Sequence, residues 1–402
     1  MRVGVIAYSF YESDGRVRRY AEALADRGDT VDVIALRDNE APYHSVIRGV
    51  NVYRIQRRNR NEKAKWTYLS KLLLFLLKSG SFITKEHLRN PYELIHVHSV
   101  PDFEVFSTFI PKQLGAKIIL DIHDIVPEFY ASKFNSDRNG FLFKVLCGIE
   151  RLSTAYSNHV IIANHIWEKV ILNRSVKNRG KCSVYLNYPD MTIFHRRPIN
   201  SKSDKFKMVY PGSLNFHQGL DVAIKALGKI RNELPQAELH IYGEGGYKPA
   251  LMKLVDALEL QDRVHFHNPV PLDKIADKIA DADLGIVPKR NDFFGGEAFS
   301  TKILEFMSLG IPVIVSRTRI DQFYFTDDVV KFFEPENEDD LAQSILTLEK
   351  DKRLRERMIQ NASKLIEDYM WDTKKLEYYA LVDSLTGREA VPEVPEKVAQ
   401  KQ

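Results

Sequence analysis

Cysteine is almost absent from this sequence, since only Cys147 and Cys182 occur among its 402 residues. So few thiols exclude a disulfide framework and a cysteine metal cluster, and they are typical of a reducing compartment. Histidine and carboxylate ligands stay open in principle, but no His-Glu-x-x-His-like spacing occurs. We expect a cytoplasmic protein, and we also expect that it requires no metal and no other cofactor.

Long hydrophobic runs are also missing. The longest, Leu72 to Leu77, is far shorter than the roughly 20 residues that span a bilayer. The opening residues "MRVGVIAYSF" lack a basic region followed by a sustained apolar one, so they predict a buried strand rather than a signal peptide. A large excess of one charge is missing too: the formal net charge is +4, which gives no indication of a nucleic-acid partner.

What the sequence does contain is a regular alternation of strand-like and helix-like segments. Apolar strand candidates such as "VGVIAY", "TVDVIAL", "ELIHVH" and "KIILDI" are separated by amphipathic stretches, and after residue 200 the pattern restarts with "FKMVYPG" and "AELHIYG". This alternation predicts an α/β protein with two Rossmann-like, doubly wound parallel-sheet domains. In such sheets, ligands bind outside the carboxyl ends of the strands.

The domain boundaries follow from the same pattern. We expect a first domain over 1–200, a second over 201–370, and a polar linker near 196–205. Residues 388–402 are expected to form a disordered tail, because they are rich in charge and proline.

The stretch "GGEAFSTKILEFMSLGIPVIVS" (295–316) carries the clearest chemical signal. A helix is predicted to begin at Ser300 or Thr301 and to end at Gly310, since glycine suits the position after a helix. Lys302 is a cation in the first turn, where the helix dipole disfavours it, and a bound phosphate would remove that objection. The alternative is a solvated helix face with a Lys302–Glu305 pair.

The pattern Glu297-x7-Glu305 followed by Gly310-x-Pro312 resembles the signature of the retaining family 4 glycosyltransferases, which have the GT-B fold of two Rossmann-like domains facing across a cleft. The resemblance covers most of the chain: it extends to "VYPGSLNFHQGLDVAIKAL" (209–227), to "LHIYGEGG", to "LNYPDMTIF", and to "MWDTKKLEYYALVDSL", which is similar to the family's closing helices. The resemblance implies that a helix over 371–387 crosses back onto the first domain.

The same resemblance implies roles for individual residues. Glu305 would bind the ribose of a nucleotide-sugar donor and Glu297 would contact the donor sugar, while Lys302 would lie near the diphosphate. Gly243, in the "YGEGG" turn, is implied on the donor side as well. Read alone, that turn is only a partial dinucleotide fingerprint, because Lys248 occupies the third glycine position.

One departure from the family concerns the phosphate-binding cations. Many members carry an arginine and a lysine where this chain has Ser213 and Gln218. Those two residues are retained as donor-binding candidates, and charge compensation is expected from Lys302, the helix N-terminus and Arg16. Lys289 and Arg290 are reserves, although a solvated loop is the favoured interpretation for both.

In the first domain, Gly15 and Arg16 open a helix after the first strand and are donor-binding candidates, with a plain turn as the alternative. His123 ends the strand in "LDIHDIVPE"; the resemblance implies that it reaches the donor sugar, so it joins Glu297 as a catalytic candidate. His98 also ends a strand and is taken as merely hydrogen-bonded.

The basic segment 60–85 has an apolar middle. It could lie on an anionic membrane beside a lipid-linked acceptor, on the inner face of the membrane. An amphipathic helix packed on the first domain is the favoured alternative.

The resulting prediction is a retaining hexosyltransferase that moves a sugar from a nucleotide-diphosphate donor, with UDP as the prior within the family, to a carbohydrate or lipid-linked hydroxyl in polysaccharide or glycolipid assembly. Two alternatives stay open: a nucleotide-sugar epimerase or hydrolase on the same fold, and a non-catalytic sugar-nucleotide-binding subunit.

Overall fold

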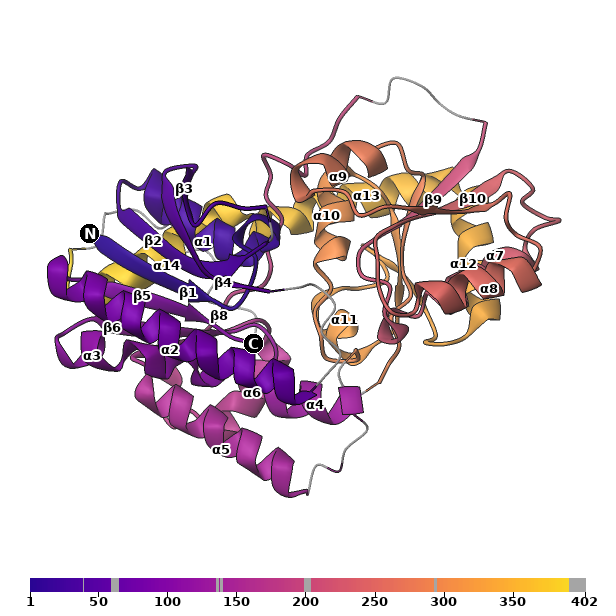
Figure 1. Cartoon of the computed structure of the whole chain (residues 1–402). Coiled ribbons are helices and arrows are strands. Elements are labelled where there is room, and N and C mark those ends of the chain that lie inside the picture. Colours follow the sequence, from indigo (N-terminus) through magenta and orange to yellow (C-terminus); the bar gives the residue numbers. More distant parts are fainter. Residues whose placement is uncertain are drawn as a thin grey trace. The chain divides into compact units, whose positions relative to one another are not determined.

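The computed structural model describes residues 1–38, 40–58, 65–134, 137, 140–198, 204–292 and 295–389. The chain forms two compact units, the first made of Met1–Leu186 with Asp372–Gln402 and the second of Asn187–Trp371 (Figure 1). Parts of the expected linker (199–203), of the basic segment (60–64) and of the tail (390–402) lie outside the described residues.

The first unit is built on an eight-stranded sheet in the order β3-β4-β2-β1-β5-β6-β7-β8. All neighbouring strands are parallel except the β3–β4 hairpin. The strands are β1 (Arg2–Ala7), β2 (Thr30–Arg37), β3 (His44–Ile47), β4 (Val50–Arg57), β5 (Leu94–His98), β6 (Lys117–Ile122), β7 (His159–Ile162) and β8 (Cys182–Val184).

Helices cover both faces of this sheet, as its nearly continuous apolar strands require. They are α1 (Gly15–Asp26), α2 (Lys65–Arg89), α3 (Phe109–Gln113) after the 3-10 turn η2 (Asp102–Thr108), α4 (Val126–Phe134), α5 (Phe141–Tyr156), α6 (His165–Arg174) and α14 (Trp371–Thr386). Helix α2 packs Ile83 over Gly4 on one face. On the other face Tyr20 of α1 and Tyr378 of α14 meet at 4.6 Å between ring centroids, beside His96.

The second unit is built on a six-stranded parallel sheet in the order β11-β10-β9-β12-β13-β14. Its strands are β9 (Phe206–Pro211), β10 (Ala237–Tyr242), β11 (Val264–His267), β12 (Leu284–Val287), β13 (Val313–Ser316) and β14 (Lys331–Phe333). Its helices are α7 (Leu220–Lys229), α8 (Lys248–Ala257), α9 (Leu272–Ile279), α10 (Thr301–Leu309), α11 (Arg319–Tyr324), α12 (Glu338–Lys350) and α13 (Lys352–Ile366).

Both sheets therefore have the doubly wound parallel arrangement that the alternating pattern predicts. In the second unit, chain order along the sheet reverses between β9 and β12, which places the topological switch point there. Among the described residues, no helix combines the length and the apolarity needed to traverse a bilayer. The segment from Lys65 to Arg89 forms α2, whose inner face packs into the first unit, as the favoured alternative for the basic segment predicts.

Candidate active site

The switch point of the second sheet is formed by two loops that follow β9 and β12. The β9 loop runs through Gly212 to the 3-10 turn η4 (Phe216–Gln218), and the β12 loop leads to α10. The loops touch, because the Arg290 amide donates to the His217 carbonyl at 2.9 Å and Gly219 lies against the Pro288 carbonyl. Doubly wound sheets bind their ligands at this position.

The N-terminus of α10 is left without a side-chain cap. Ser300 occupies the N-cap position, but its side chain accepts no hydrogen bond from the helix amides. Its Oγ is buried without a hydrogen-bond partner among the described residues, and the first turn contains no acidic residue. A buried hydroxyl without a partner is costly, and uncapped amides attract anions. This corner is therefore built to receive a ligand oxygen that carries negative charge.

Lys302, in the first turn of α10, lies directly over Gly212. A Cβ on Gly212 would stand 2.4 Å from Lys302 Cε and 3.1 Å from its Nζ. The Lys302 ammonium also lies 5.1 Å from the centre of the Tyr210 ring, within cation–π range. Burial lowers the pKa of Lys302 to about 8, while Glu305 raises it and Lys289 lowers it. An anion in this corner would restore the charge that burial disfavours.

Gly212 should not tolerate a side chain. Its φ of +146° is unfavourable for L residues, and Gly212→Ala would push the Lys302 side chain aside. We expect this variant to bind a nucleoside diphosphate at least about tenfold more weakly by calorimetry, since a charge-assisted hydrogen bond contributes roughly 1.5–3 kcal/mol.

Gly246→Ala is the matched control, because nothing lies within 4 Å of a Cβ at that position. It should leave the affinity unchanged. Equal affinity in both variants would show that Lys302 and the β9 loop take no part in binding.

The other expected donor-binding residues of the β9 and β10 loops lie in the same region. Gly243 has a φ of +155°, and a Cβ there would collide with the Gly212 carbonyl at 1.9 Å, so the two turns touch. Gln218 accepts a hydrogen bond from the Tyr210 hydroxyl at 2.8 Å, and Ser213 accepts one through its carbonyl at 3.0 Å. The structure thus brings Ser213, Gln218 and Gly243 together with Lys302.

The two glutamates lie on different elements. Glu305 is a half-buried residue of α10, one turn beyond Lys302. Glu297 precedes the helix, so the two glutamates do not lie on one helix. Its carboxylate accepts a 2.7 Å hydrogen bond from Arg319, whose side chain is 68% exposed. Arg319 could therefore move away and release Glu297 to another partner.

Lys289 and Arg290 correct the expectation of a solvated loop, since both are buried. Lys289 pairs with Asp321 at 2.9 Å and donates to the Ala298 carbonyl. Arg290 donates to both oxygens of Asp221. Because these side chains are already committed, they hold the β12 loop in place rather than serving as reserve phosphate ligands.

Arg16, in the first unit, is also committed elsewhere. It is buried, its guanidinium donates to both Asp121 oxygens at 2.7 and 2.8 Å, and it reaches the Tyr185 carbonyl at 2.8 Å. Gly15 begins α1, where Asp14 caps the amides of Arg16 and Val17. The Asp14 carboxylate therefore occupies the start of the helix, where a bound anion was expected to account for the presence of Arg16. Both residues have a visible structural role, and their donor-binding role stays a prediction.

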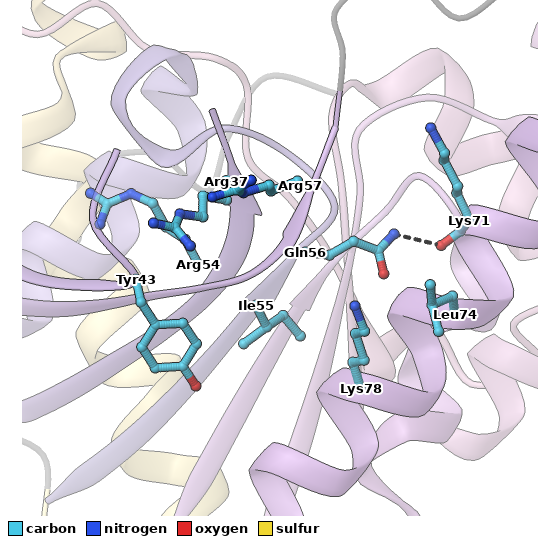
Figure 2. A pocket seen from close by; sticks show the side chains of 9 residues that line it. All are labelled: Arg37, Tyr43, Arg54, Ile55, Gln56, Arg57, Lys71, Leu74 and Lys78. Carbon is cyan, nitrogen blue, oxygen red and sulfur yellow. Dashed lines mark hydrogen bonds between the residues drawn. The ribbon is translucent and has the colours of Figure 1, made fainter. Parts of the chain in front are cut away.

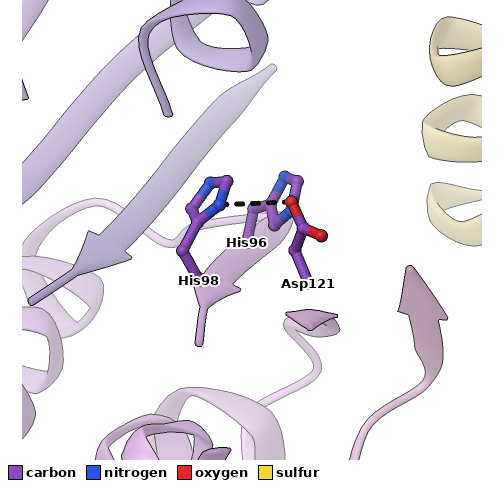
Figure 3. Close-up of side chains that lie close together, drawn as sticks. All are labelled: His96, His98 and Asp121. Atoms are coloured by element: carbon purple, nitrogen blue, oxygen red, sulfur yellow. Dashed lines mark ion pairs between the residues drawn. The ribbon is translucent and has the colours of Figure 1, made fainter. Parts of the chain in front are cut away.

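His96, His98 and Asp121 form a buried polar cluster (Figure 3), and His123, which directly follows β6, contacts it. Its Nε2 lies 2.9 Å from His98 Nδ1 and 3.4 Å from Asp121 Oδ2. Burial lowers the pKa of His98 to about 3, so this imidazole is neutral. His98 is hydrogen-bonded, as expected, and together with Asp121 it orients His123, whose side chain is 22% exposed.

The donor atoms of His96, His98 and Asp121 lie close enough together to hold a metal ion. Arg16 already occupies both carboxylate oxygens, however, so an ion pair fills the place of a ligand. We therefore infer that the cluster orients the His123 side chain.

The sequence alone did not indicate two contributors to the second-unit site. The first is Tyr210, whose ring underlies Lys302 and whose hydroxyl ties Gln218 to the loop. The second is the partnerless Ser300 hydroxyl, which the sequence suggested only as a possible helix cap. Neither residue stands out by type; a tyrosine directly before "PG" at the end of a switch-point strand was the available signal for the first.

Comparison with known families assigns both halves of the chain. Residues 15–177 match the glycosyl transferase 4-like domain, and residues 192–365 match the glycosyl transferases group 1. The chain is also similar over most of its length to an uncharacterised glycosyltransferase of Methanocaldococcus jannaschii, with 25% identity over 92% of this chain and 94% of that protein. It is 25% identical to the sulfoquinovosyl transferase of Arabidopsis thaliana, over 76% of this chain and 59% of that protein.

Solved structures share the fold. The sucrose-phosphate synthase of Thermosynechococcus elongatus superimposes with a TM-score of 0.77 at 20% identity, over 96% of this chain and 99% of that one. HepE of Anabaena, solved in complex with UDP-glucose, superimposes with a TM-score of 0.72 at 16% identity, over 96% of this chain and all of that one.

Proposed function

The chain is a GT-B glycosyltransferase of the family 4 type, and from this premise we propose that it transfers a sugar, with retention, from a nucleoside-diphosphate donor to a hydroxyl acceptor. The observation that supports this best is the corner of Ser300, Lys302 and Gly212 at the switch point of the second sheet. It offers helix amides that no side chain caps, a hydroxyl without a hydrogen-bond partner among the described residues, and the Lys302 ammonium to one anion. UDP is the donor nucleotide we propose, and HepE, which shares the fold, has been solved with UDP-glucose.

In the proposed reaction, the anomeric carbon–oxygen bond to the diphosphate breaks while a bond to the acceptor oxygen forms on the same face. Negative charge grows on the departing diphosphate, and the α10 N-terminus with Lys302 stabilises it electrostatically without requiring a metal. The departing phosphate oxygen accepts the proton of the acceptor hydroxyl. Glu297 and His123 orient the transferred sugar.

His123 is prepared for this role by its buried neighbours. Asp121 is ionised, because Arg16 and the surrounding hydrogen bonds hold its pKa well below the usual range against the cost of burial. A fixed carboxylate 3.4 Å away and a neutral His98 at 2.9 Å limit the orientations of the His123 ring. A sugar hydroxyl would therefore meet an imidazole of set orientation.

Donor binding should be coupled to proton uptake. At pH 8.5 the free protein holds Lys302 largely neutral, because its pKa is about 8. A bound diphosphate favours the charged form of Lys302 and so raises its pKa. UDP itself is fully ionised at pH 8.5, because a terminal phosphate titrates at about pH 6. We expect calorimetry in buffers of different ionisation enthalpy to show uptake of up to about three-quarters of a proton at pH 8.5, the fraction of Lys302 that a pKa of about 8 leaves neutral.

At pH 6.5 Lys302 is already charged in the free protein, so its contribution to proton uptake should vanish. A Lys302→Met variant should show no uptake at pH 8.5. If wild type and variant exchange the same number of protons there, the diphosphate does not bind at Lys302.

For the acceptor and the pathway, we propose a chemical class rather than a specific compound. We propose polysaccharide or glycolipid assembly with a carbohydrate or lipid-linked acceptor, and a cytoplasmic enzyme, which suits its two buried free cysteines. Incubation with a panel of nucleotide sugars and acceptors separates the alternatives. Acceptor-dependent product with the donor's anomeric configuration is expected. An epimer or free sugar formed without acceptor would indicate an epimerase or hydrolase, and binding without turnover a non-catalytic subunit.

A further inference from the structure

A basic pocket of about 340 Å³ opens at the carboxyl ends of β2 and β4, against α2 (Figure 2). Five of its lining residues are cations, namely Arg37, Arg54, Arg57, Lys71 and Lys78, and no carboxylate of a described residue lines it. Like charges that converge on one cavity repel one another unless an anion enters. The pocket lies at the carboxyl ends of the strands, the end of a doubly wound sheet that binds ligands, although the switch point of this sheet is between β1 and β5.

Four of the five cations of this pocket fall into two groups. Arg54 and Arg37 are held in place: Arg54 donates to Glu12 at 3.0 Å and to the Pro42 carbonyl at 3.0 Å, and Arg37 donates to the Ala41 carbonyl at 2.8 Å. By contrast, Arg57 and Lys78 form no ion pair with any described residue, and both are exposed. These two cations are available to a ligand.

Gln56 adds a polar group of a different kind. Its amide nitrogen donates to the Lys71 carbonyl at 2.8 Å, which fixes the side chain, as Figure 2 shows. Its Oε1 is buried and has no hydrogen-bond partner in the described part of the chain. A fixed acceptor beside two available cations fits a phosphate ester that also carries a hydroxyl.

Helix α2 presents three different faces at this place. Its inner face, with Leu72, Phe75, Ser79 and Ile83, is buried. A second stripe, Lys71, Leu74 and Lys78, lines the pocket at i, i+3, i+7 spacing.

The third stripe faces solvent and is entirely apolar. Leu69, Leu73 and Leu77 follow one another at intervals of four residues, with exposed fractions of 42%, 47% and 70%. Single exposed leucines are common, but three successive ones along one helix that also lines a basic pocket are typical of a surface that is covered in use. A soluble sugar phosphate would leave these leucines in water, whereas the acyl region of a membrane would cover them.

We propose that this surface binds an anionic phospholipid, with the headgroup phosphate between Arg57 and Lys78 and the leucine stripe (Leu69, Leu73, Leu77) in the acyl boundary. A headgroup hydroxyl donates to Gln56 Oε1. The site lies on the first unit, belongs to residues that take no part in the donor site, and does not depend on the proposed donor. It directs the enzyme to membranes that carry negative charge.

Vesicle sedimentation tests the proposal. The full-length protein should sediment with phosphatidylcholine vesicles that contain phosphatidylglycerol and stay in solution with phosphatidylcholine alone. Arg57→Glu combined with Lys78→Glu should reduce the partition coefficient at least about tenfold, since each surface cation contributes about fivefold. Leu73→Ser combined with Leu77→Ser should reduce it as well. The matched control is Lys352→Glu with Arg353→Glu, two exposed cations of α13, which should sediment like the wild type.

Unchanged melting curves by circular dichroism should show that each variant has folded. Calorimetry with UDP should give wild-type affinity for every variant, which separates a failure here from a failure of the proposed donor site in the second unit. The proposal is overturned if the wild type does not sediment, if the Arg57/Lys78 variant sediments equally well, or if vesicles without phosphatidylglycerol bind equally. Tight binding of soluble glycerol phosphate, unchanged by the leucine substitutions, would overturn it too, because the site would then serve a free solute.

Discussion

Replacement of Glu305 by alanine should weaken the binding of UDP about 10- to 100-fold, the cost of losing hydrogen bonds to a charged group. Glu305 is a half-buried residue of α10 one turn beyond Lys302, so a nucleotide whose diphosphate meets the helix N-terminus would extend its ribose along the same helix. A carboxylate accepts from both ribose hydroxyls, and removing it leaves two donors without partners. Isothermal titration calorimetry measures the loss.

A double-mutant comparison makes this test specific. Wild type should lose affinity when UDP is replaced by its 2′-deoxy or 3′-deoxy analogue, and Glu305→Ala should not distinguish the three ligands. Glu356→Ala, an exposed glutamate of α13, is the control and should bind as the wild type does. An unchanged affinity in Glu305→Ala would remove the ribose role.

Replacement of Lys302 by methionine should lower kcat about 10²- to 10³-fold, the typical effect of removing one group that stabilises charge developing in the transition state. Methionine keeps most of the lysine stem, so the packing over Gly212 survives while the ammonium is lost. Turnover under saturating donor and acceptor measures the effect.

The same variant should not lose stability. Folding lowers the Lys302 pKa from 10.5 to about 8, so at pH 7 the folded protein carries a buried charge that the unfolded chain keeps in water. That cost is present below about pH 8 and fades as pH rises towards 10.5, and methionine removes it. The melting temperature at pH 7 should stay equal or rise, with Lys253→Met, an exposed lysine of α8, as the reference. A near-normal kcat in Lys302→Met would show that groups other than Lys302 stabilise the charge on the departing diphosphate.

The parts of the fold that depend on local chemistry are predictable from the sequence. The helix expected from Ser300 or Thr301 to Gly310 is observed as Thr301–Leu309, with Gly310 at a φ of +74°. The apolar run "ELIHVH" becomes β5. The β3–β4 hairpin was missed, because its turn uses Arg48 and Gly49, both at positive φ, and arginine is a weak signal for that conformation.

The sequence does not predict which carboxylate each buried cation pairs with. Arg16 pairs with Asp121, which lies 105 residues away in the sequence, and Arg290 pairs with Asp221, which lies 69 residues away. Nothing local in either segment distinguishes an arginine that meets a buried carboxylate from one that meets a ligand. Lys302 differs because its place in a first turn is anomalous in itself, and the structure supplies a reason, since no side chain caps α10 and the buried Ser300 hydroxyl has no hydrogen-bond partner among the described residues.

A crystal structure of the protein with UDP is the most direct test of the donor site. We expect the terminal phosphate to contact the Ser300 hydroxyl, the first amides of α10 and the Lys302 ammonium over Gly212, with the ribose hydroxyls donating to Glu305. A nucleotide bound away from the ends of β9 and β12, or a Glu305 carboxylate that touches no part of it, would contradict the account.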